Sequence, residues 1–378
     1  MAAGDLRGEC KKTATAINKG AVCGSTKVAC GRFTPAAQTP LSCRVKNTAN
    51  CKVGKQFEEH ACTAQTHCAD VLDWTASTCV DVRTTGPFGA GVMLRRFTKK
   101  SVVTPSANRI LDTVLWSPTA AGAGPVDAVY GGVLDAALDT SAGPYPLLMF
   151  SHGSCGLPTQ ATFLMPLLAS QGFIIVAPPH PGNTLTDFPT CGGTQALVDS
   201  ARERPEDILF VLEAMLAANL DGTSPFVAAI DASKLGMSGH SFGGFTTYRV
   251  TELDARFNAA LSFAAYVAPE QHLTIPSLTM LGQLDSVVDN GAIRTAYASS
   301  VSPKYLVEIA NTGHFAWSDR CFPTPDCAPP ATLTQDEAHD AVRRWVLPFL
   351  KVYLAGDASF APFLAPITGP GFVFDAAP

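Results

Sequence analysis

The sequence predicts an α/β fold with a mostly parallel central sheet flanked by helices, preceded by a small cysteine-rich domain. From Val92 onward, short β-like apolar runs alternate with helix-like stretches, which is typical of strands joined by helical crossovers. The central runs are almost entirely apolar, as expected for strands buried on both faces of a parallel sheet. Of twelve cysteines, eight precede residue 84. We therefore expect one domain at residues 1–83 and a second at residues 84–378.

The cysteine-rich segment, residues 1–83, contains four units of two cysteines each, and successive units are spaced by roughly 17–21 residues. Few large apolar residues lie between the cysteines, so the segment depends on cross-links rather than on an ordinary core. The even number predicts disulfides, and the lack of a Cys-x-x-Cys pair disfavours a metal site. Many pairings are possible, so no connectivity is assigned. The cysteines are Cys10, Cys23, Cys30, Cys43, Cys51, Cys62, Cys68 and Cys79.

The role and location of this segment are inferred from composition. A spacer or cap is favoured over a surface-attachment or polymer-binding module, because aromatic residues are few. Disulfides persist in oxidising compartments, so we expect a secreted or periplasmic protein. Residues 1–5 carry no apolar signal core, and we expect that a leader peptide has been removed.

The composition disfavours several classes of function. Apolar residues make up 47% of the chain and charged residues 16%, which supports a sizeable buried core. The formal net charge is −5 and no basic stripe is present, so we expect no nucleic-acid partner. No apolar run approaches the roughly 20 residues needed to span a bilayer, so we expect no transmembrane segment.

The second domain contains eight predicted strands and four predicted helices. The strands are expected at residues 91–97, 109–116, 146–150, 173–177, 234–238, 259–263, 277–281 and 305–309. The helices are expected at residues 159–171, 206–219, in the run after Ser241, and at 336–354. Pro205 suits the first turn of the second helix. Residues 118–144 are rich in Ala, Gly and Pro, which predicts loops and an extra edge strand.

Residues 239–244, GHSFGG, are the first motif that carries chemistry. They follow the strand at 234–238 and precede a helix-compatible run. A Gly-x-Ser-x-Gly turn in that setting lifts the serine hydroxyl above the sheet edge, which favours Ser241 as a nucleophile. The same turn directs the Phe242 amide and the helix N-terminus toward a developing oxyanion.

Residues 151–156, SHGSCG, are the second motif, directly after the strand at 146–150. A His-Gly turn after a central strand supplies a second oxyanion donor in this type of site. The Ser154 backbone N–H is the preferred donor, with Cys155 as the alternative register. His152 is interpreted as a structural residue that packs beneath the turn rather than as a base.

Two further post-strand residues complete a candidate triad. Asp285, just past the strand at 277–281, can accept the Nδ1–H of a histidine, and Asp289 is its competitor. His314 lies on the glycine-containing loop after the strand at 305–309 and is the candidate base. The order Ser, Asp, His suits an elbow-type nucleophile. Only 43 and 28 residues separate the three, so we expect an open cleft without a large lid.

The remaining candidates surround this site. Leu157, Phe242, Phe315 and Trp317 are close to it in sequence and are candidates to line a substrate cleft. Two disulfides are plausible in the second domain: Cys155 with Cys191, which would brace the oxyanion turn, and Cys321 with Cys327, which would stiffen the histidine loop. A free Cys155 is the alternative. The pattern implies neither a metal nor an organic cofactor.

These residues resemble a known group of enzymes. The sequence is similar to dienelactone-hydrolase-like and platelet-activating-factor-acetylhydrolase-like α/β-hydrolases across roughly residues 86–355. Residues 86–89 and the strands after them also resemble cutinase-like polyesterases. The resemblance implies Ser241, Asp285 and His314 as the triad and the Ser154 and Phe242 amides as the oxyanion hole. It is carried by FSHGSCG, LLASQGFIIVAPPHPGNT, ERPEDILFVLEAM, GMSGHSFGG and GHFAWSDRC.

The sequence therefore predicts an α/β-hydrolase that cleaves carboxylic esters through an acyl-enzyme, with an open cleft for small, bulky or polymeric esters. The name dienelactone hydrolase usually implies a cysteine nucleophile, whereas this chain has Ser241. Two alternatives are kept: a peptidase on the same fold, and a surface-binding protein that has lost turnover.

Overall fold

The computed structural model describes residues 28–31, 42–45, 66–68, 79–81, 85–268, 270–319, 333–364 and 372–377. Two short antiparallel pairs lie in the cysteine-rich segment: β1 (Val28–Gly31) with β2 (Ser42–Val45), and β3 (Thr66–Cys68) with β4 (Cys79–Asp81). Cys30 is opposite Cys43 in the first pair, and Cys68 is opposite Cys79 in the second. The other cysteines of residues 1–83, and Cys321 and Cys327, lie outside the described residues.

A ten-stranded sheet forms the centre of the described second part, in the order β14-β13-β12-β11-β10-β8-β9-β6-β5-β7. Six consecutive strands of the sheet, β13, β12, β11, β10, β8 and β9, pair in parallel, whereas β6 and β14 run antiparallel to their neighbours. In chain order they are β5 (Gly89–Lys100), β6 (Asn108–Thr119), β7 (Val133–Leu134), β8 (Tyr145–Ser151), β9 (Ile174–Ala177), β10 (Ile230–His240), β11 (Phe257–Phe263), β12 (Ser277–Gly282), β13 (Lys304–Ile309) and β14 (Phe372–Ala377).

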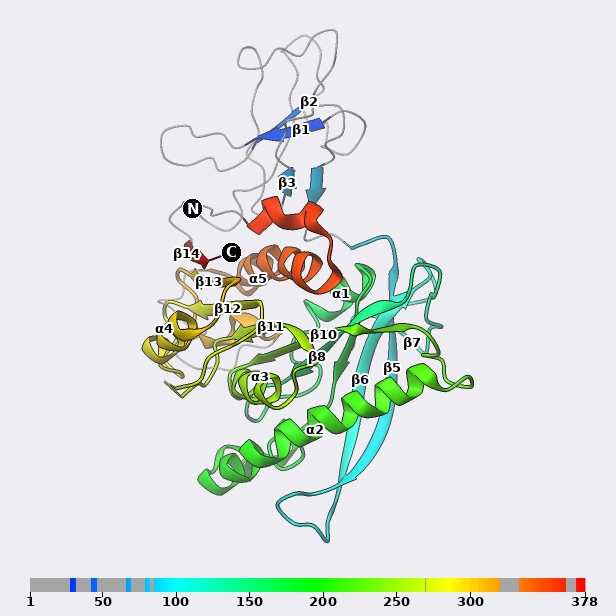
Figure 1. The fold of residues 1–378 in the computed structure, drawn as a ribbon, viewed down its shortest axis with the longest axis vertical. Coiled ribbons are helices and arrows are strands. Elements are labelled where there is room, and N and C mark those ends of the chain that lie inside the picture. Colours follow the sequence, from blue (N-terminus) through cyan, green and yellow to red (C-terminus); the bar gives the residue numbers. More distant parts are fainter. Residues whose placement is uncertain are drawn as a thin grey trace.

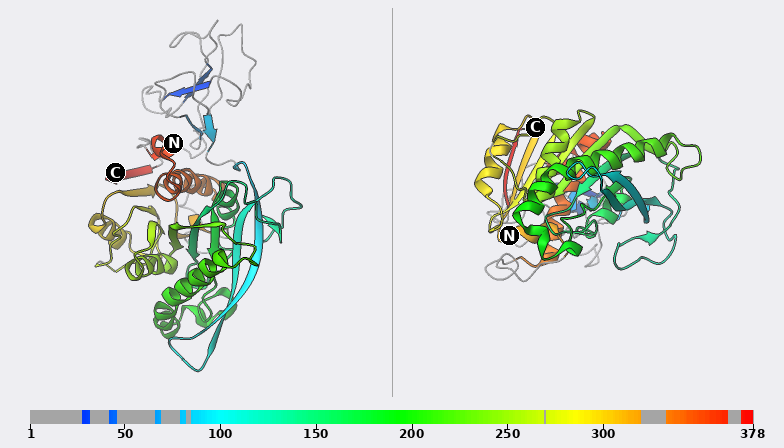
Figure 2. Two further views of the ribbon diagram at one scale, coloured as in Figure 1. Left: turned by 45° about the vertical axis from the view of Figure 1, so that its right-hand side comes forward. Right: turned by 90° about the horizontal axis from the view of Figure 1, so that it is seen from below.

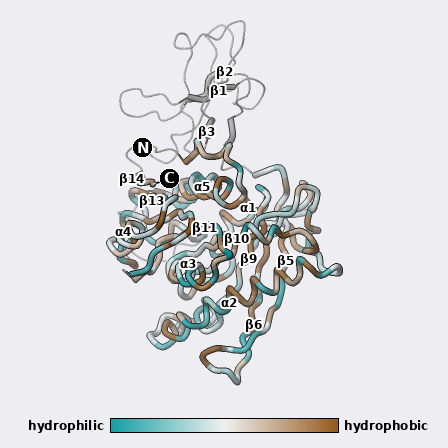
Figure 3. The backbone as a smooth tube through the Cα atoms, viewed as in Figure 1, coloured by the Kyte–Doolittle hydropathy of each residue, from teal (hydrophilic) through white to brown (hydrophobic). Residues whose placement is uncertain are grey.

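The eight predicted strands are confirmed, and β7 is the predicted edge strand. Strands β8, β9 and β12 are buried at every residue, which explains why each appears in the sequence as an unbroken apolar run. Figure 3 shows these hydrophobic positions gathered in the middle of the sheet. Strands β5 and β6 extend beyond their predicted ends as a long hairpin, coloured cyan in Figure 1, in which half-buried and exposed residues alternate along the middle of β5.

Helices cover both faces of the sheet (Figures 1 and 2). One apolar core packs α1 and α5 against one face, and two further cores pack α2, α3 and α4 against the other. The chain therefore builds a three-layer α/β/α domain. The helices are α1 (Met165–Ser170), α2 (Thr194–Leu220), α3 (Phe242–Leu253), α4 (Asn290–Ser299) and α5 (Gln335–Leu350).

Helix boundaries differ from the predictions at several points. Pro205 does not start a helix: α2 begins at Thr194 and runs through Pro205 for 27 residues. Proline removes one helical hydrogen bond, but buried contacts on the same turn offset that loss. The predicted helix at 159–171 is helical only from Met165, α5 ends at Leu350 before a π-helical turn, and α4 was not predicted.

The carboxyl ends of four parallel strands position the candidate site. Strands β8, β10, β12 and β13 end at residues 151, 240, 282 and 309. Because parallel strands end at the same edge of a sheet, the segments that follow them meet there.

Candidate active site

Ser241 lies on the sharp turn between β10 and α3. Its backbone has φ 56° and ψ −118°, a conformation that L-residues rarely adopt. The neighbouring glycines permit the turn by close approach: a Cβ on Gly239 would lie 2.1 Å from the Gly243 carbonyl oxygen. A Cβ on Gly243 would lie 1.9 Å from the Ser151 carbonyl oxygen. The observed turn therefore requires glycine at both positions, as the GHSFGG pattern predicts.

His314 and Asp285 come together at the ends of β13 and β12. The Nδ1 atom of His314 is 2.8 Å from Oδ2 of Asp285, and the imidazole is almost entirely buried. A proton on Nδ1 donates to the carboxylate and leaves Nε2 with its lone pair. The competitor, Asp289, is instead the N-cap of α4, where its side chain accepts from the Gly291 amide.

A cavity of about 450 Å³ is lined by five of the predicted residues, namely Ser154, Leu157, Ser241, His314 and Phe315. Its wall contains Ser241 and His314 as well as residues of the 151–156 turn and of the loop before β7. It includes Gly153, Ser154, Leu157, Leu185, Val129, Val287 and Phe315.

Trp317 is not part of the wall described for this cavity, contrary to the prediction. Its indole is 1% exposed and stacks on His240 and Phe263, with ring centroids 6.3 and 6.5 Å apart. The Phe242 ring is also directed elsewhere and stacks on Phe245. Sequence proximity to a catalytic loop did not distinguish core aromatics from cleft aromatics.

The turn after β8 is held from several sides. The Cys155 amide donates to the Asn183 carbonyl at 3.1 Å, which occupies the alternative oxyanion donor. Cys155 also forms the predicted disulfide with Cys191. His152 is fully buried: its Nε2 accepts from the His180 amide, so its proton is on Nδ1 and donates to the Gly153 carbonyl at 2.7 Å. Burial lowers the pKa of His152 well below 6.5 and keeps it neutral.

Gln160 links three loops of the site and was not predicted from the sequence. Its Oε1 accepts from the Gly153 amide at 2.8 Å, and its Nε2 is 2.5 Å from Nδ1 of His240. Nε2 of His240 in turn donates to the His314 carbonyl at 2.8 Å. Burial lowers the pKa of His240 well below 6.5, so it remains neutral and can both accept and donate. No motif marks an isolated glutamine of this kind.

A second serine–histidine–aspartate group lies deeper in the molecule. Ser151 Oγ is 2.9 Å from Nε2 of His180, whose Nδ1 is 3.1 Å from Oδ2 of Asp207. All three side chains have 0% exposure, and none belongs to the wall described for the cavity. Burial and the nearby positive charge of Arg204 lower the pKa of His180 well below 6.5.

Among the residues that the structure describes, no group of three His, Cys, Asp or Glu side chains could hold a metal ion. Within that part of the chain, no helix is long and apolar enough to cross a bilayer.

Comparison with known proteins identifies similar enzymes. The profile of the family described as PET hydrolase-like matches residues 129–368. Cutinase est1 from Thermobifida alba is 25% identical over 46% of this chain and 54% of its own length. Bis(hydroxyethyl) terephthalate hydrolase from Streptomyces coelicolor is 22% identical over 65% of this chain and 69% of its own length. Platelet-activating factor acetylhydrolase from Cavia porcellus is 24% identical over 57% of this chain and 59% of its own length.

The similarity therefore covers about half to two thirds of these relatives. Among solved structures, a ferulic acid esterase from Streptomyces cinnamoneus has a TM-score of 0.58 and 21% identity. It covers 71% of this chain and 91% of that protein. At that identity the match supports the α/β-hydrolase fold alone.

Proposed function

Because the chain belongs to the PET hydrolase-like family, we propose that it is a carboxylic ester hydrolase with Ser241 as nucleophile, His314 as base and Asp285 as orienting acid. One observation carries the proposal: the cavity wall contains a serine on a strained elbow together with a histidine whose Nδ1 is bound to a buried carboxylate. A serine and a carboxylate-oriented histidine in one cavity wall are the groups that acyl transfer through an activated serine requires.

The proposed reaction proceeds by acyl transfer. His314 Nε2 takes the proton from Ser241 Oγ as the oxygen attacks the ester carbonyl carbon. The tetrahedral intermediate collapses, the ester C–O bond breaks, and His314 gives its proton to the departing alcohol. Water then attacks the acyl-enzyme with His314 again as base, releasing the acid and restoring Ser241. Asp285 holds the imidazole tautomer and stabilises its transient positive charge.

The Ser154 and Phe242 amides are the proposed oxyanion hole. Phe242 is the first residue of α3, so its N–H has no partner within the helix. The helix N-terminus adds a favourable partial charge. Ser154 faces the cavity on the opposite loop, and its neighbour Cys155 already donates to Asn183.

The Ser151, His180 and Asp207 group is the competing assignment within the same function. An ester carbonyl has no route to a serine with 0% exposure. Ser151 Oγ also accepts from Arg204 Nη1 at 3.2 Å, which stabilises its present position. We therefore assign this group a structural role.

Serine labelling separates the two assignments. A fluorophosphonate should modify Ser241, and Ser241→Ala should lose both the label and nearly all turnover of p-nitrophenyl butyrate, on the order of 10⁵-fold or more. Ser151→Ala, the matched control, should keep the label on Ser241. Labelling at Ser151, or turnover that survives Ser241→Ala, would refute the proposal.

The proposal extends to bulky esters. The cavity rim carries the exposed valines Val129 and Val287, 61% and 55% exposed, and Leu157 contributes to the apolar wall. The intervals between the triad residues are largely occupied by α3, β11, β12, α4 and β13, so within residues 242–309 we infer no large lid domain. We expect bis(hydroxyethyl) terephthalate to be hydrolysed with a kcat/KM within about tenfold of that for p-nitrophenyl butyrate. Val287→Asp should reduce kcat/KM for bis(hydroxyethyl) terephthalate more than kcat/KM for p-nitrophenyl butyrate. A thousandfold preference for p-nitrophenyl butyrate would contradict an open cleft.

A further inference from the structure

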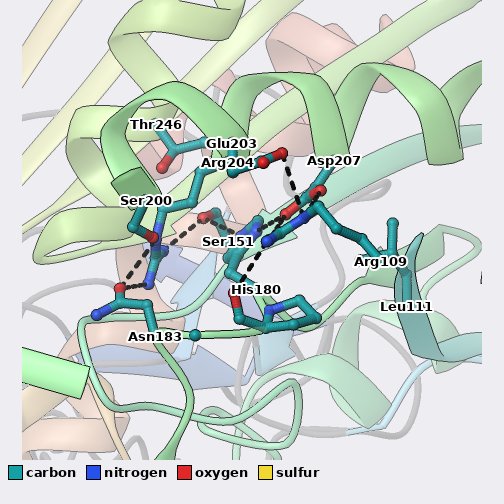
Figure 4. A network of polar contacts seen from close by, with 12 residues as sticks. Arg109, Leu111, Ser151, His180, Asn183, Ser200, Glu203, Arg204, Asp207 and Thr246 are labelled. Atoms are coloured by element: carbon teal, nitrogen blue, oxygen red, sulfur yellow. Dashed lines mark hydrogen bonds and ion pairs between the residues drawn. The ribbon is translucent and has the colours of Figure 1, made fainter. Parts of the chain in front are cut away.

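Arg204, on α2, is a fully buried cation beneath the turn that follows β8. Its guanidinium donates to neutral oxygens of Ser151, Asn183 and Ser200, with donor–acceptor distances from 2.5 to 3.2 Å (Figure 4). Burial lowers its pKa to about 9, so it remains charged at neutral pH. A buried charge is costly, and its placement against one loop calls for an explanation.

Two successive carbonyls of the turn point at this guanidinium. Nη1 of Arg204 is 2.5 Å from the His152 carbonyl oxygen, and Nη2 is 3.1 Å from the Gly153 carbonyl oxygen. The His152 side chain and the Gly156 amide also donate to the Gly153 carbonyl. Three donors therefore fix the Gly153–Ser154 peptide plane. One of them, Arg204, also fixes the preceding peptide through the His152 carbonyl.

The orientation of these carbonyls determines the orientation of the amides. In a trans peptide, the C=O of one residue and the N–H of the next point in opposite directions. The His152 carbonyl points at Arg204, and the Gly153 amide accordingly points away, to Gln160. The Gly153 carbonyl also points at Arg204, so the Ser154 N–H is directed away from α2. That N–H is one of the two proposed oxyanion donors.

Arg204 also contacts the other side of the hole. Its Cζ lies 4.9 Å from the centroid of the Phe242 ring, a cation–π distance. The Ser241 carbonyl accepts from the Gly244 and Tyr266 amides at 2.9 and 3.0 Å, so the Phe242 N–H points the other way. A single side chain thus touches the two segments whose spacing sets the width of the hole.

We propose that Arg204 is a positioning residue that sets the orientation and spacing of the Ser154 and Phe242 amides. The inference rests on the proposed function, in which an oxyanion forms at Ser241. The planar guanidinium of Arg204 is required for this role, because the point charge of an ammonium group cannot hold two adjacent carbonyls and an aromatic face together. Loss of the fork should weaken transition-state stabilisation while leaving ground-state binding of the ester intact.

The test compares Arg204→Lys and Arg204→Met with the unaltered enzyme, using p-nitrophenyl butyrate. Active Ser241 is counted by fluorophosphonate labelling taken to completion, so unfolded protein does not contribute. We expect kcat per labelled site to fall about 100-fold in Arg204→Met and about 10-fold in Arg204→Lys, with KM within about threefold. The preference for an ester over its thionoester should fall in parallel, since sulfur fits the hole poorly.

The matched control is Arg344→Met. Arg344, on α5, is also fully buried, and it donates to the Phe363 carbonyl rather than to the turn after β8. We expect it to lower stability but to keep kcat per labelled site within twofold.

Three outcomes count against the inference. If Arg204→Met keeps kcat per labelled site within twofold of the unaltered enzyme, the inference is refuted and the proposed function stands. The same holds if kcat/KM falls only because KM rises. If Arg204→Met does not fold, Arg204→Lys decides by the same criterion. Failure of the unaltered protein to label at Ser241 refutes the proposed function and this inference together.

Discussion

Gln160 is suited to its position because an amide side chain has both an acceptor and a donor. Its oxygen takes the Gly153 N–H, and its nitrogen donates to Nδ1 of His240. His240 passes the connection to the backbone of His314. At the residue scale, one side chain therefore couples the oxyanion turn, the nucleophile elbow and the histidine loop.

Gln160→Leu should disrupt that coupling. Two polar groups would lose their partners in a buried setting, so we expect a loss of about 1–3 kcal/mol in the free energy of unfolding. We also expect kcat per labelled site to fall roughly tenfold, because the Gly153 peptide is released on one side. Urea unfolding and ester kinetics measure the two effects.

The control for this change is Gln195→Leu. Gln195 is exposed at the start of α2 and bonds only Asp199 in the described structure, so its replacement should change stability by no more than about 0.5 kcal/mol. Equal effects of the two leucine variants would show that the coupling does not exist.

At the scale of elements, hydrogen bonds and a disulfide join loops that are distant in sequence near the carboxyl edge of the sheet. The Asp319 carboxylate accepts from the Thr162 and Phe163 amides at 2.6 and 2.8 Å, which ties the segment after His314 to the segment before α1. The Cys155–Cys191 disulfide similarly joins the turn after β8 to the segment before α2. These links give precise geometry to loops that carry the chemistry.

Removal of the disulfide tests the second link. The two cysteines are 36 residues apart, and a cross-link of that length contributes about 3–4 kcal/mol in the chain-entropy model. Cys155→Ala/Cys191→Ala should lose a large part of that free energy of unfolding, measured by urea denaturation.

Reductant supplies the control for this prediction. Dithiothreitol should destabilise the catalytic domain of the unaltered protein more than that of the double variant. Non-reducing peptide mapping should recover a peptide pair joined through Cys155 and Cys191. Free thiols at both positions in exported protein would contradict the assignment.

At the scale of the described molecule, the sheet and the contact between His314 and Asp285 were predictable, whereas the polar network beneath them was not. Strands β8 and β12 are buried at every residue and appear as apolar runs, and the candidate residues follow closely after the ends of β8, β10, β12 and β13, so the apolar runs and the chain order indicated both. The start of α2 was not predictable, because Pro205 is tolerated only through buried contacts of the surrounding turns. Gln160 belongs to no motif. Arg204 lies within the run ERPEDILFVLEAM, but nothing in that run indicates its contacts with the His152 and Gly153 carbonyls, which are 52 and 51 residues away.

The same buried network predicts acid sensitivity of the whole fold. His152, His180 and His240 are fully or almost fully buried, and burial, with the positive charge of Arg204 beside the first two, holds their pKa values well below 6.5. Below pH 6.5 the unfolded chain binds a proton at each histidine, whereas the folded chain does not. The unfolded state then binds more protons, so stability falls as pH falls.

Each of these histidines should lower the free energy of unfolding by up to about 1.4 kcal/mol per pH unit below pH 6.5, until the folded protein itself takes up the proton. We therefore expect the free energy of unfolding, measured in urea, to change little from pH 8 to 7 and to decline steeply from pH 6.5 to 5. His240→Gln should make that decline shallower, because it removes one of the three groups. His272→Gln, at an exposed position, should not change the slope. A flat profile between pH 7 and 5 would mean that the three imidazoles already carry protons in the folded protein, and the neutral donor–acceptor pattern assigned to them here would then be wrong.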